Sequence, residues 1–507
     1  MVDLDLLHSL PDEVISYREQ VQPVLERRCV VCHGCFDAPC QLKLSAYEGI
    51  TRGANRKKVY DGSRIRAVQP NRLFIDAKTP AQWRERGFSP VLHEGGQNDP
   101  LQNLEGSVLY RMLRLKQLNP QPRTGMLPDS FDLELDRKQV CAKPDEFDRF
   151  SRDHPLWGMP YAMPNLDPDE YKVLVQWLAQ GAPAPQAGQP SAQAQAQIIE
   201  WERFLNQPGK KQRLVSRYLY EHLFHAHIHF SGTSDREFYR LIRSTTPTGV
   251  EADEIPTVRP FDDPGTSSFY YRLVPYQASI VAKAHLPYEF SPQRMARFRE
   301  LFLKPDYVVT QLPGYDQRIA SNPFKSFAAL PPDARYRFLL DDARFFINGF
   351  IKGPVCRGQV ALNVIDDQFW VVFFDPDRKL ITSDSAFLSE VADYLQMPAE
   401  WGNSTLKLLK PWTEYSTKQR AYRQARDAQL SGLKPMELDQ ALEYIWDGDG
   451  QNRNAALTVF RHFDSAAVEY GFVGDYPETA WMIDYPLFER IHYLLVAGFD
   501  VYGNVGH

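Results

Sequence analysis

The sequence predicts a mostly helical protein with some β-structure, built from two domains that a linker separates. Apolar residues recur at helical spacing in many segments, whereas one region alternates polar residues with β-branched and aromatic ones. Residues 182–197 are rich in Ala, Pro and Gln, a composition typical of linkers. We therefore place a first domain at residues 1–181 and a larger domain of mixed α and β structure, mainly helical, at residues 198–507. No internal repeat is visible.

The first domain is expected to begin and end with a helix. Residues 12–28 carry an apolar face, and a later helix starts at Asp167, a suitable N-cap, with Pro168 in its first turn and Glu170 completing a capping box. Gly181 is a suitable helix end. Residues 41–155 contain turn-rich polar stretches. This segment is longer than a small domain framed by two terminal helices needs, so we interpret it as a large insertion.

The run Cys29-Val30-Val31-Cys32-His33 is the most informative motif of the chain. It has the C-x-x-C-H spacing of covalent haem attachment, in which two thiols add to the porphyrin vinyl groups and the histidine becomes the proximal iron ligand. The motif predicts one covalently bound haem c and a cytochrome c-like first domain, with the insertion covering the haem. The competing interpretation is a zinc or redox site, because Cys35 and Cys40 lie close by.

Two methionines before the last helix of this domain are candidates for the sixth iron ligand. Met159 stands in Gly158-Met159-Pro160, seven residues before Leu166, which is the spacing expected of a cytochrome c methionine loop. Met163 also precedes a proline but lies only three residues before Leu166. We favour Met159, keep Met163 as the alternative, and also consider an iron without a methionine ligand at rest.

The other four cysteines suit an oxidising compartment. Cys35 and Cys40 are close enough in sequence to close a small loop, and Cys141 would then pair with Cys356. The alternative is four free thiols.

The second domain combines several helical segments with a predicted hairpin. Residues 359–365 alternate polar and β-branched types, and Asp366-Asp367 then leads into the apolar run 369–374, which predicts a buried β-hairpin. Helical spacing predicts helices over residues 198–205, 210–224, 386–395, 417–429, 437–446 and 489–498, and one that begins at Ser291 with Pro292 in its first turn.

An unusual group of histidines follows the helix predicted at residues 210–224. The four lie within eight residues, at His222, His225, His227 and His229. They could bind a metal, reach the distal side of the haem or donate to a phosphate, and we name His225 and His227 as candidate catalytic residues. The alternative is a set of partly buried imidazoles satisfied by backbone and carboxylate groups.

The composition of the chain argues against some classes of binding partner. The formal net charge is −6, and the absence of a long basic run argues against nucleic acid and against polybasic docking to anionic lipid. No apolar stretch reaches the roughly 18 residues that span a bilayer. Arg272, Lys283 and Arg357 could contact an anion, although surface cations are the default explanation. The sequence does not set the oligomeric state.

Four blocks of the sequence resemble bacterial fatty acid cis/trans isomerases, which are periplasmic c-type haem proteins. The first block, from Cys29 to Leu44, covers the haem motif; the others are Arg52-Gly53-Ala54-Asn55, Tyr220-Glu221-His222-Leu223-Phe224 and the run from residue 353 to residue 363. The resemblance implies a periplasmic enzyme that converts cis double bonds of phospholipid acyl chains to trans. It would contact the membrane peripherally. It also implies that a presequence was removed or replaced, and that the fold would continue beyond His507.

The expected chemistry is electrophilic. Ferric haem would draw π density from the double bond until it rotates, which requires a sixth ligand that is weak, displaceable or absent in the active form. The alternative function is electron transfer by a c-type cytochrome fused to a large binding domain. Formation of trans acyl chains without an electron donor would distinguish the two.

Overall fold

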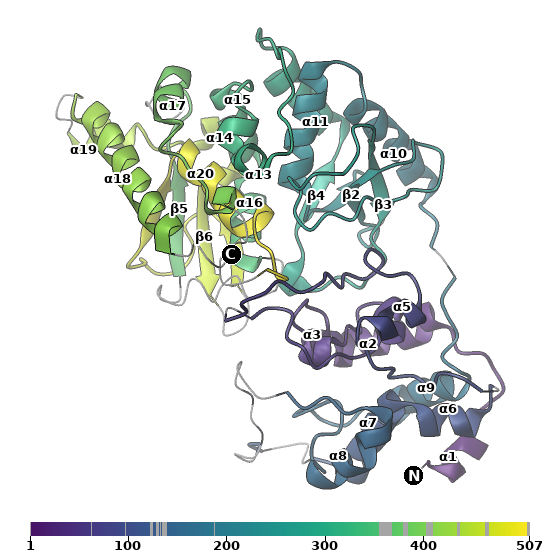
Figure 1. Ribbon diagram of the computed structural model, residues 1–507. Helices are drawn as coiled ribbons and strands as arrows, with labels where there is room; N and C mark the ends of the chain where they lie inside the picture. Colours follow the sequence, from purple (N-terminus) through teal and green to yellow (C-terminus); the bar gives the residue numbers. More distant parts are fainter. Residues whose placement is uncertain are drawn as a thin grey trace. The chain divides into compact units, whose positions relative to one another are not determined.

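The computed structural model describes two compact units (Figure 1). The first unit comprises Met1–Tyr60, Pro70–Gly188 and Gln277–Ala282, and the second comprises Asp61–Gln69, Gln189–Tyr276 and Lys283–His507. The described residues are 2–503, except 62, 97, 122–124, 128–130, 132, 134–138, 187, 354–367, 379–383, 402–408, 433–436 and 462–465.

Among the described residues of the first unit, every named regular element is a helix. Its helices are α1 Leu4–His8, α2 Gln22–Arg28, α3 Val30–His33, α4 Tyr47–Arg52, α5 Pro80–Glu85, α6 Pro100–Gly106, α7 Val108–Leu118, α8 Phe147–Asp153 and α9 Pro168–Ala179. The turn Tyr17–Val21 before α2 is a π-helix with Ser16 as its N-cap. The predicted helix over residues 12–28 therefore starts five residues late, and Val14, which lies before it, is largely exposed.

Helix α9 forms as its sequence predicts. The Glu170 carboxylate accepts the backbone N–H of Asp167 at 3.3 Å, and Gly181 adopts a positive φ of 80° directly after the helix. Apolar side chains of α9 share one core with those of α2, α6 and α7, among them Val24, Leu25, Leu104, Leu113, Leu174 and Leu178. Residues 41–155, interpreted from sequence as an insertion, thus contribute side chains of α4, α6, α7 and α8 to this core.

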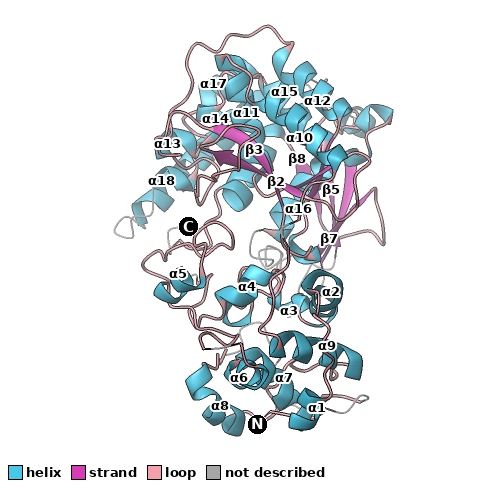
Figure 2. Ribbon diagram, turned by 90° about the vertical axis from the view of Figure 1, so that its right-hand side faces the viewer, coloured by secondary structure: helices cyan, strands magenta, loops and turns pink. Residues whose placement is uncertain are grey.

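The second unit is a mixed α/β structure, and all named strands lie in it (Figure 2). The helices are α10 Ala192–Leu205, α11 Lys210–Leu223, α12 Pro292–Phe298, α13 Gln317–Ala320, α14 Pro323–Ser326, α15 Pro332–Asp341, α16 Ala343–Lys352, α17 Ser385–Val391, α18 Leu409–Ser431, α19 Leu438–Leu442 and α20 Tyr485–His492. The strands are β1 His227–Phe230, β2 Tyr239–Ser244, β3 Tyr270–Pro275, β4 Pro287–Phe290, β5 Gln368–Phe373, β6 Ala456–Arg461, β7 Ala466–Tyr470 and β8 Ala480–Ile483.

The strands form two sheets with the same topology. The strand orders are β3-β2-β1-β4 and β7-β6-β5-β8, and in each sheet three strands form an antiparallel meander while the fourth runs parallel to the first. The fourth strand leads each time into a helix with a polar N-cap and an early proline, α12 after Ser291 and α20 after Asp484. A π-helical turn follows both helices. The repeat is one of topology, which explains why the sequence does not reveal it.

Three sequence predictions for this unit need correction. Both edges of β5 pair with described strands, β6 and β8, so the predicted hairpin of residues 369–374 with residues 359–365 is wrong; residues 359–365 themselves lie outside the described part. Helix α10 starts at Ala192, inside the predicted linker, because Ser191 caps it. Helix α19 covers only part of the predicted residues 437–446.

The predicted fold class is confirmed at its coarser level. The chain is mixed α and β and mainly helical, with small mixed sheets in the second unit. A cytochrome c-like fold for the first unit stays a prediction.

Candidate functional site

The C-x-x-C-H motif occupies a single helical turn after α2. The backbone N–H of Cys29 donates to Leu25 O at 2.8 Å, and that of His33 donates to Cys29 O at 2.9 Å. Residues 29, 32 and 33 are thus spaced i, i+3 and i+4 along this turn, with Cys29 at its N-cap. Cys29 is half-buried, Cys32 is exposed and His33 is buried.

Two neighbouring segments hold this turn in place. Arg28 donates to Glu170 at 2.8 Å and to Asp167 at 3.0 Å, which ties the motif to the start of α9. After His33, a Cβ on Gly34 would lie 2.6 Å from the Val281 side chain, so the segment Gln277–Ala282 packs closely here and requires glycine.

The orientation of the His33 imidazole suits an axial ligand. Nδ1 lies 2.8 Å from the carbonyl oxygen of Leu42. Because a carbonyl can only accept, Nδ1 carries the proton and the lone pair resides on Nε2. This is the usual outer-shell arrangement of a metal-binding histidine.

The cysteine pairing differs from the predicted one. Cys40 is bonded to Cys141, with their Cα atoms 5.7 Å apart, and Cys35 is also disulfide-bonded. The predicted Cys35–Cys40 and Cys141–Cys356 pairs are therefore wrong, since the second pair would need the same Cys141 sulfur; Cys356 lies outside the described residues. The C-x-x-C cysteines are free thiols.

These pairings weaken the alternatives to haem. The sulfurs of Cys35 and Cys40 are committed to disulfides and cannot act as zinc thiolates. Burial, with the nearby Cys32 and Glu170, raises the pKa of the Cys29 thiol to about 12, whereas redox C-x-x-C sites rely on a low thiol pKa. Within the described parts of the chain, no group of three or more His, Cys, Asp or Glu side chains could hold a metal ion.

The candidate methionine loop is anchored on the end of α7. The backbone N–H of Met159 donates to Met112 O at 3.1 Å, and a Cβ on Gly158 would lie 2.3 Å from the backbone nitrogen of Lys116. Only glycine permits this approach. Met163 follows in the turn before α9, and both methionines are half-buried.

Lys116, beneath this loop, carries a buried amine without a hydrogen-bond partner among the described residues. Its side chain is 2 % exposed, and burial lowers its pKa to about 8. A buried amine of this kind is costly unless an anion or an electrophile compensates it. Two free thiols and one oriented imidazole on the C-x-x-C-H turn are the donors that a covalently attached haem requires.

His222 lies in a buried polar network of the second unit, where a backbone carbonyl and a carboxylate satisfy its imidazole, as the alternative interpretation of the histidine group expected. Nδ1 lies 2.8 Å from Tyr218 O and therefore carries a proton, while Nε2 lies 3.0 Å from Glu489 Oε1. The short Nε2–Oε1 contact needs one further proton, held by the imidazole or by the carboxyl group. Tyr218 donates to the other Glu489 oxygen at 3.0 Å, and the His492 ring stacks on His222 at 4.6 Å.

The network continues to Glu221 and joins α11 to α20. Tyr493 donates to Glu221 at 2.6 Å and Arg217 donates to it at 2.7 Å. Burial lowers the pKa of His492 well below its usual value. The side chains of His222, Glu221 and Glu489 are fully buried, so the network stabilises the helix pair.

His227 is a core imidazole at the start of β1. Its Nδ1 accepts the Leu286 N–H at 3.1 Å and lies 3.3 Å from Nδ1 of His285. Burial and the neighbouring cations lower the pKa of His227 to about 3 and that of His285 to about 4. Both rings are therefore neutral at pH 7. A catalytic role for His225 or His227 stays a prediction.

The comparison with known proteins decides the family. The fatty acid cis/trans isomerase family matches residues 68–507, which is most of the chain. This chain is a fatty acid cis/trans isomerase family member. No curated protein and no solved structure matches it. The predicted family and the predicted isomerase class are confirmed, while the haem motif precedes the matched residues.

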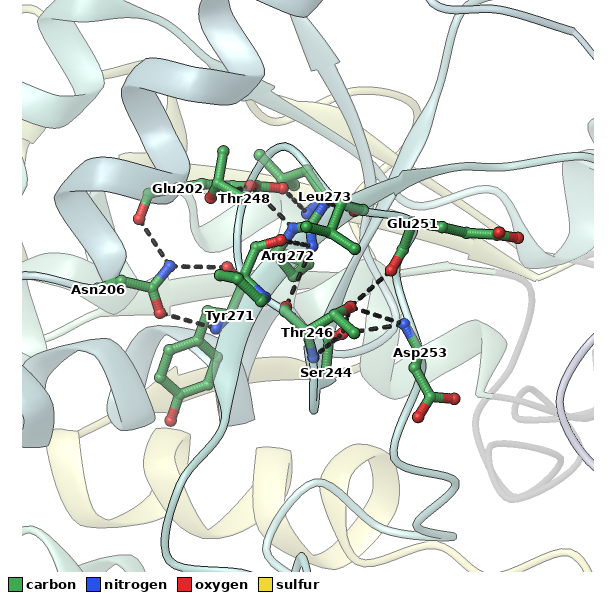
Figure 3. Close-up of polar contacts among 12 residues, drawn as sticks. Glu202, Asn206, Ser244, Thr246, Thr248, Glu251, Asp253, Tyr271, Arg272 and Leu273 are labelled. Carbon is green, nitrogen blue, oxygen red and sulfur yellow. Dashed lines mark hydrogen bonds and ion pairs between the residues drawn. The ribbon is translucent and has the colours of Figure 1, made fainter.

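Arg272 has a structural role in this isomerase. Figure 3 shows its guanidinium beside Glu202, to which it forms an ion pair of 2.9 Å, and it also donates to Thr246 O at 3.1 Å and to Val250 O at 3.0 Å. Its charge is therefore satisfied by a buried carboxylate and by the loop after β2. Arg272 is therefore a buried residue and not a surface cation, and Arg357 lies outside the described residues.

The isomerase acts on a lipid-derived substrate, yet among the described residues no helix is both long enough and apolar enough to cross a bilayer. The sequence did not indicate the buried amine of Lys116 or that Glu489 is the carboxylate partner of His222. Lys116 follows Leu109 and Leu113 at helical spacing, a signal that would have placed it on the buried face of α7.

Proposed function

We propose that this isomerase converts cis double bonds in the acyl chains of membrane phospholipids to trans, with one haem c attached to Cys29 and Cys32 in the periplasm. The family match carries the isomerase class and the fatty acyl substrate. The oriented imidazole of His33 and the two free thiols on one helical turn support haem attachment.

Rotation about a carbon–carbon double bond is easier when an electrophilic group of the enzyme withdraws its π electrons. Rotation about a double bond removes its π overlap, and turnover near once per second requires an overall barrier of about 17 kcal/mol. A bound ferric haem would supply such an electrophilic centre, and the reaction would need no net redox change.

The chain's own residues would hold and tune this group. Cys29 and Cys32 would form the thioether bonds, and His33 would bind the iron through Nε2 while its Nδ1–H donates to Leu42 O. Met159, on the loop anchored to α7, is the proposed sixth ligand, with Met163 as the alternative; the ligand must be weak or displaceable in the active form. Lys116 would compensate a haem carboxylate.

The test uses purified holoprotein and vesicles of cis-monounsaturated phosphatidylcholine without any electron donor. Gas chromatography of the released acyl chains should show trans isomers with unchanged chain length and double-bond position. Haem staining of a denaturing gel should show a covalent haem. Vesicles that stay entirely cis would contradict the proposed activity, and a colourless protein after expression with a haem-maturation system would contradict the cofactor.

A further inference from the structure

A cluster of exposed apolar side chains lies on the second sheet of the second unit. This aromatic patch consists of the exposed Phe472, Val473, Tyr476 and Met482 together with the half-buried Trp370. Tyr476 is 90 % exposed, Phe472 is 55 % exposed, and Val473 and Met482 are 43 % and 45 % exposed. The Trp370 ring lies 4.5 Å from that of Phe472 and 5.7 Å from that of Tyr476, centroid to centroid.

Strand alternation places the patch on the outer face of the sheet. In β5 the side chains of Phe369, Val371 and Phe373 are buried, so Trp370 points to the opposite face. Trp370 pairs with Ala480 and Val372 pairs with Met482 in the parallel ladder between β5 and β8. Met482 therefore lies on the same face as Trp370.

The loop between β7 and β8 is held firmly in its exposed position. The backbone N–H of Val473 donates to Thr458 at 3.0 Å, and Gln368 donates to the carbonyl oxygen of Asp475. Gly474 has a positive φ of 86° and packs against the Gln368 side chain. The aromatic rings are thus presented to solvent by a defined turn, although exposed apolar area is unfavourable in water and marks interaction sites.

We propose that the aromatic patch docks the protein on the surface of a zwitterionic phospholipid bilayer. Tyr476 enters the boundary between headgroups and acyl chains, where aromatic rings with a polar edge are enriched, and Phe472 and Val473 bury apolar surface beside it. This inference rests on the proposed function, because an enzyme that acts on acyl chains within a bilayer must reach that boundary. The patch gives it a contact without a membrane span.

Charge decides which bilayer suits the patch. The charged residues of the loop, Asp475 and Glu478, are both acidic and exposed. They repel anionic headgroups, and docking through apolar rings depends little on salt. Binding to phosphatidylcholine should therefore be stronger than binding to membranes rich in phosphatidylglycerol.

Vesicle sedimentation tests the docking directly. Holoprotein is mixed with dioleoylphosphatidylcholine vesicles, and Tyr476→Ser and Phe472→Ser are each expected to lower the partition coefficient about tenfold through lost apolar burial. The matched controls are Val308→Ser and Leu438→Ser, which remove exposed apolar side chains elsewhere and should bind as the wild type does. Asp475→Asn should raise binding to vesicles that contain phosphatidylglycerol.

Unchanged vesicle binding by both Tyr476→Ser and Phe472→Ser overturns the proposal. If these variants bind vesicles as the wild type does but elute later than it in size-exclusion chromatography, the patch joins two copies of this chain, and the proposal is also overturned. Since Tyr476 is almost entirely exposed, its variant should fold normally even if Phe472→Ser does not.

A second substrate separates this inference from the proposed function. The patch variants should isomerise detergent-dispersed oleate at the wild-type rate and lose activity only on vesicles. If the wild type isomerises neither substrate, the proposed function fails while the vesicle-binding result still stands. If the variants lose activity equally on both substrates, the docking role fails.

Discussion

At the residue scale, single buried groups of this isomerase have their protonation fixed by one neighbour. The carbonyl oxygen of Leu42 keeps the proton of His33 on Nδ1, and the backbone N–H of Leu286 keeps the lone pair of His227 on Nδ1. The first arrangement leaves Nε2 basic toward iron. The second makes His227 an acceptor that cannot take a proton without losing a buried hydrogen bond.

His227 makes the second unit sensitive to acid. Its pKa in the folded state is about 3, below the usual value near 6.5, so the unfolded chain binds the proton more tightly. As the pH falls below 6.5, His227 takes up a proton in the unfolded chain but not in the folded protein. The free energy of unfolding therefore decreases, by about 2 kcal/mol at pH 5. Urea unfolding at pH 7 and pH 5 should show this loss in the wild type and a smaller one in His227→Gln.

Gly158 is predicted to be intolerant of any side chain. A Cβ there would lie 2.3 Å from the backbone nitrogen of Lys116, so Gly158→Ala must displace the loop that carries Met159. We expect a loss of about 2 kcal/mol in the free energy of unfolding and an altered haem absorption spectrum. Gly314→Ala is the control, because a Cβ there meets no heavy atom closer than 4.0 Å. Equal behaviour of the two variants would contradict the close packing of this loop.

At the element scale, the buried network between α11 and α20 connects the two topologically equivalent halves of the second unit. Glu489→Leu removes the carboxyl group that contacts His222 Nε2 and leaves this buried imidazole nitrogen without a partner. The variant should lose about 3 kcal/mol in the free energy of unfolding. Glu489→Gln should cost about 1 kcal/mol, because its amide can donate to Nε2 and its carbonyl can accept from Tyr218. Chemical denaturation measures both, with the exposed Glu390→Leu as the control.

The Cys40–Cys141 disulfide stabilises the first unit across a long stretch of chain. The bonded residues are 101 positions apart. In the chain-entropy description, a loop of this length contributes about 4.7 kcal/mol by restricting the unfolded chain. Cys40→Ala combined with Cys141→Ala should lower the thermal midpoint while leaving haem staining intact, and loss of the haem in this variant would show that the disulfide also builds the site.

Local signals predicted the local elements of the fold and of the site. The cap of α9 at Asp167 and the cap of α12 at Ser291 follow from short patterns, and both form as predicted. Short sequence patterns did not predict which distant residues or strands pair with one another. The disulfide partner of Cys40 lies 101 residues away, and Glu489, the partner of His222, lies 267 residues away. Strand β5 pairs with β6 and β8, which are also distant in sequence, and not with the run that precedes it.

At the scale of the whole molecule, the proposed activity requires a part of the chain that lies outside the family match. The match spans residues 68–507, whereas the thiols that would hold the haem stand at positions 29 and 32. Cys29→Ala combined with Cys32→Ala should therefore give a folded protein without covalent haem and without isomerase activity. Haem staining, circular dichroism and the vesicle assay measure these three outcomes. The disulfide double variant should show the reverse pattern, haem present and stability reduced, so the two variants separate cofactor attachment from folding. A colourless Cys29→Ala, Cys32→Ala protein that still forms trans acyl chains would place the catalytic group within residues 68–507 and remove the haem from the mechanism.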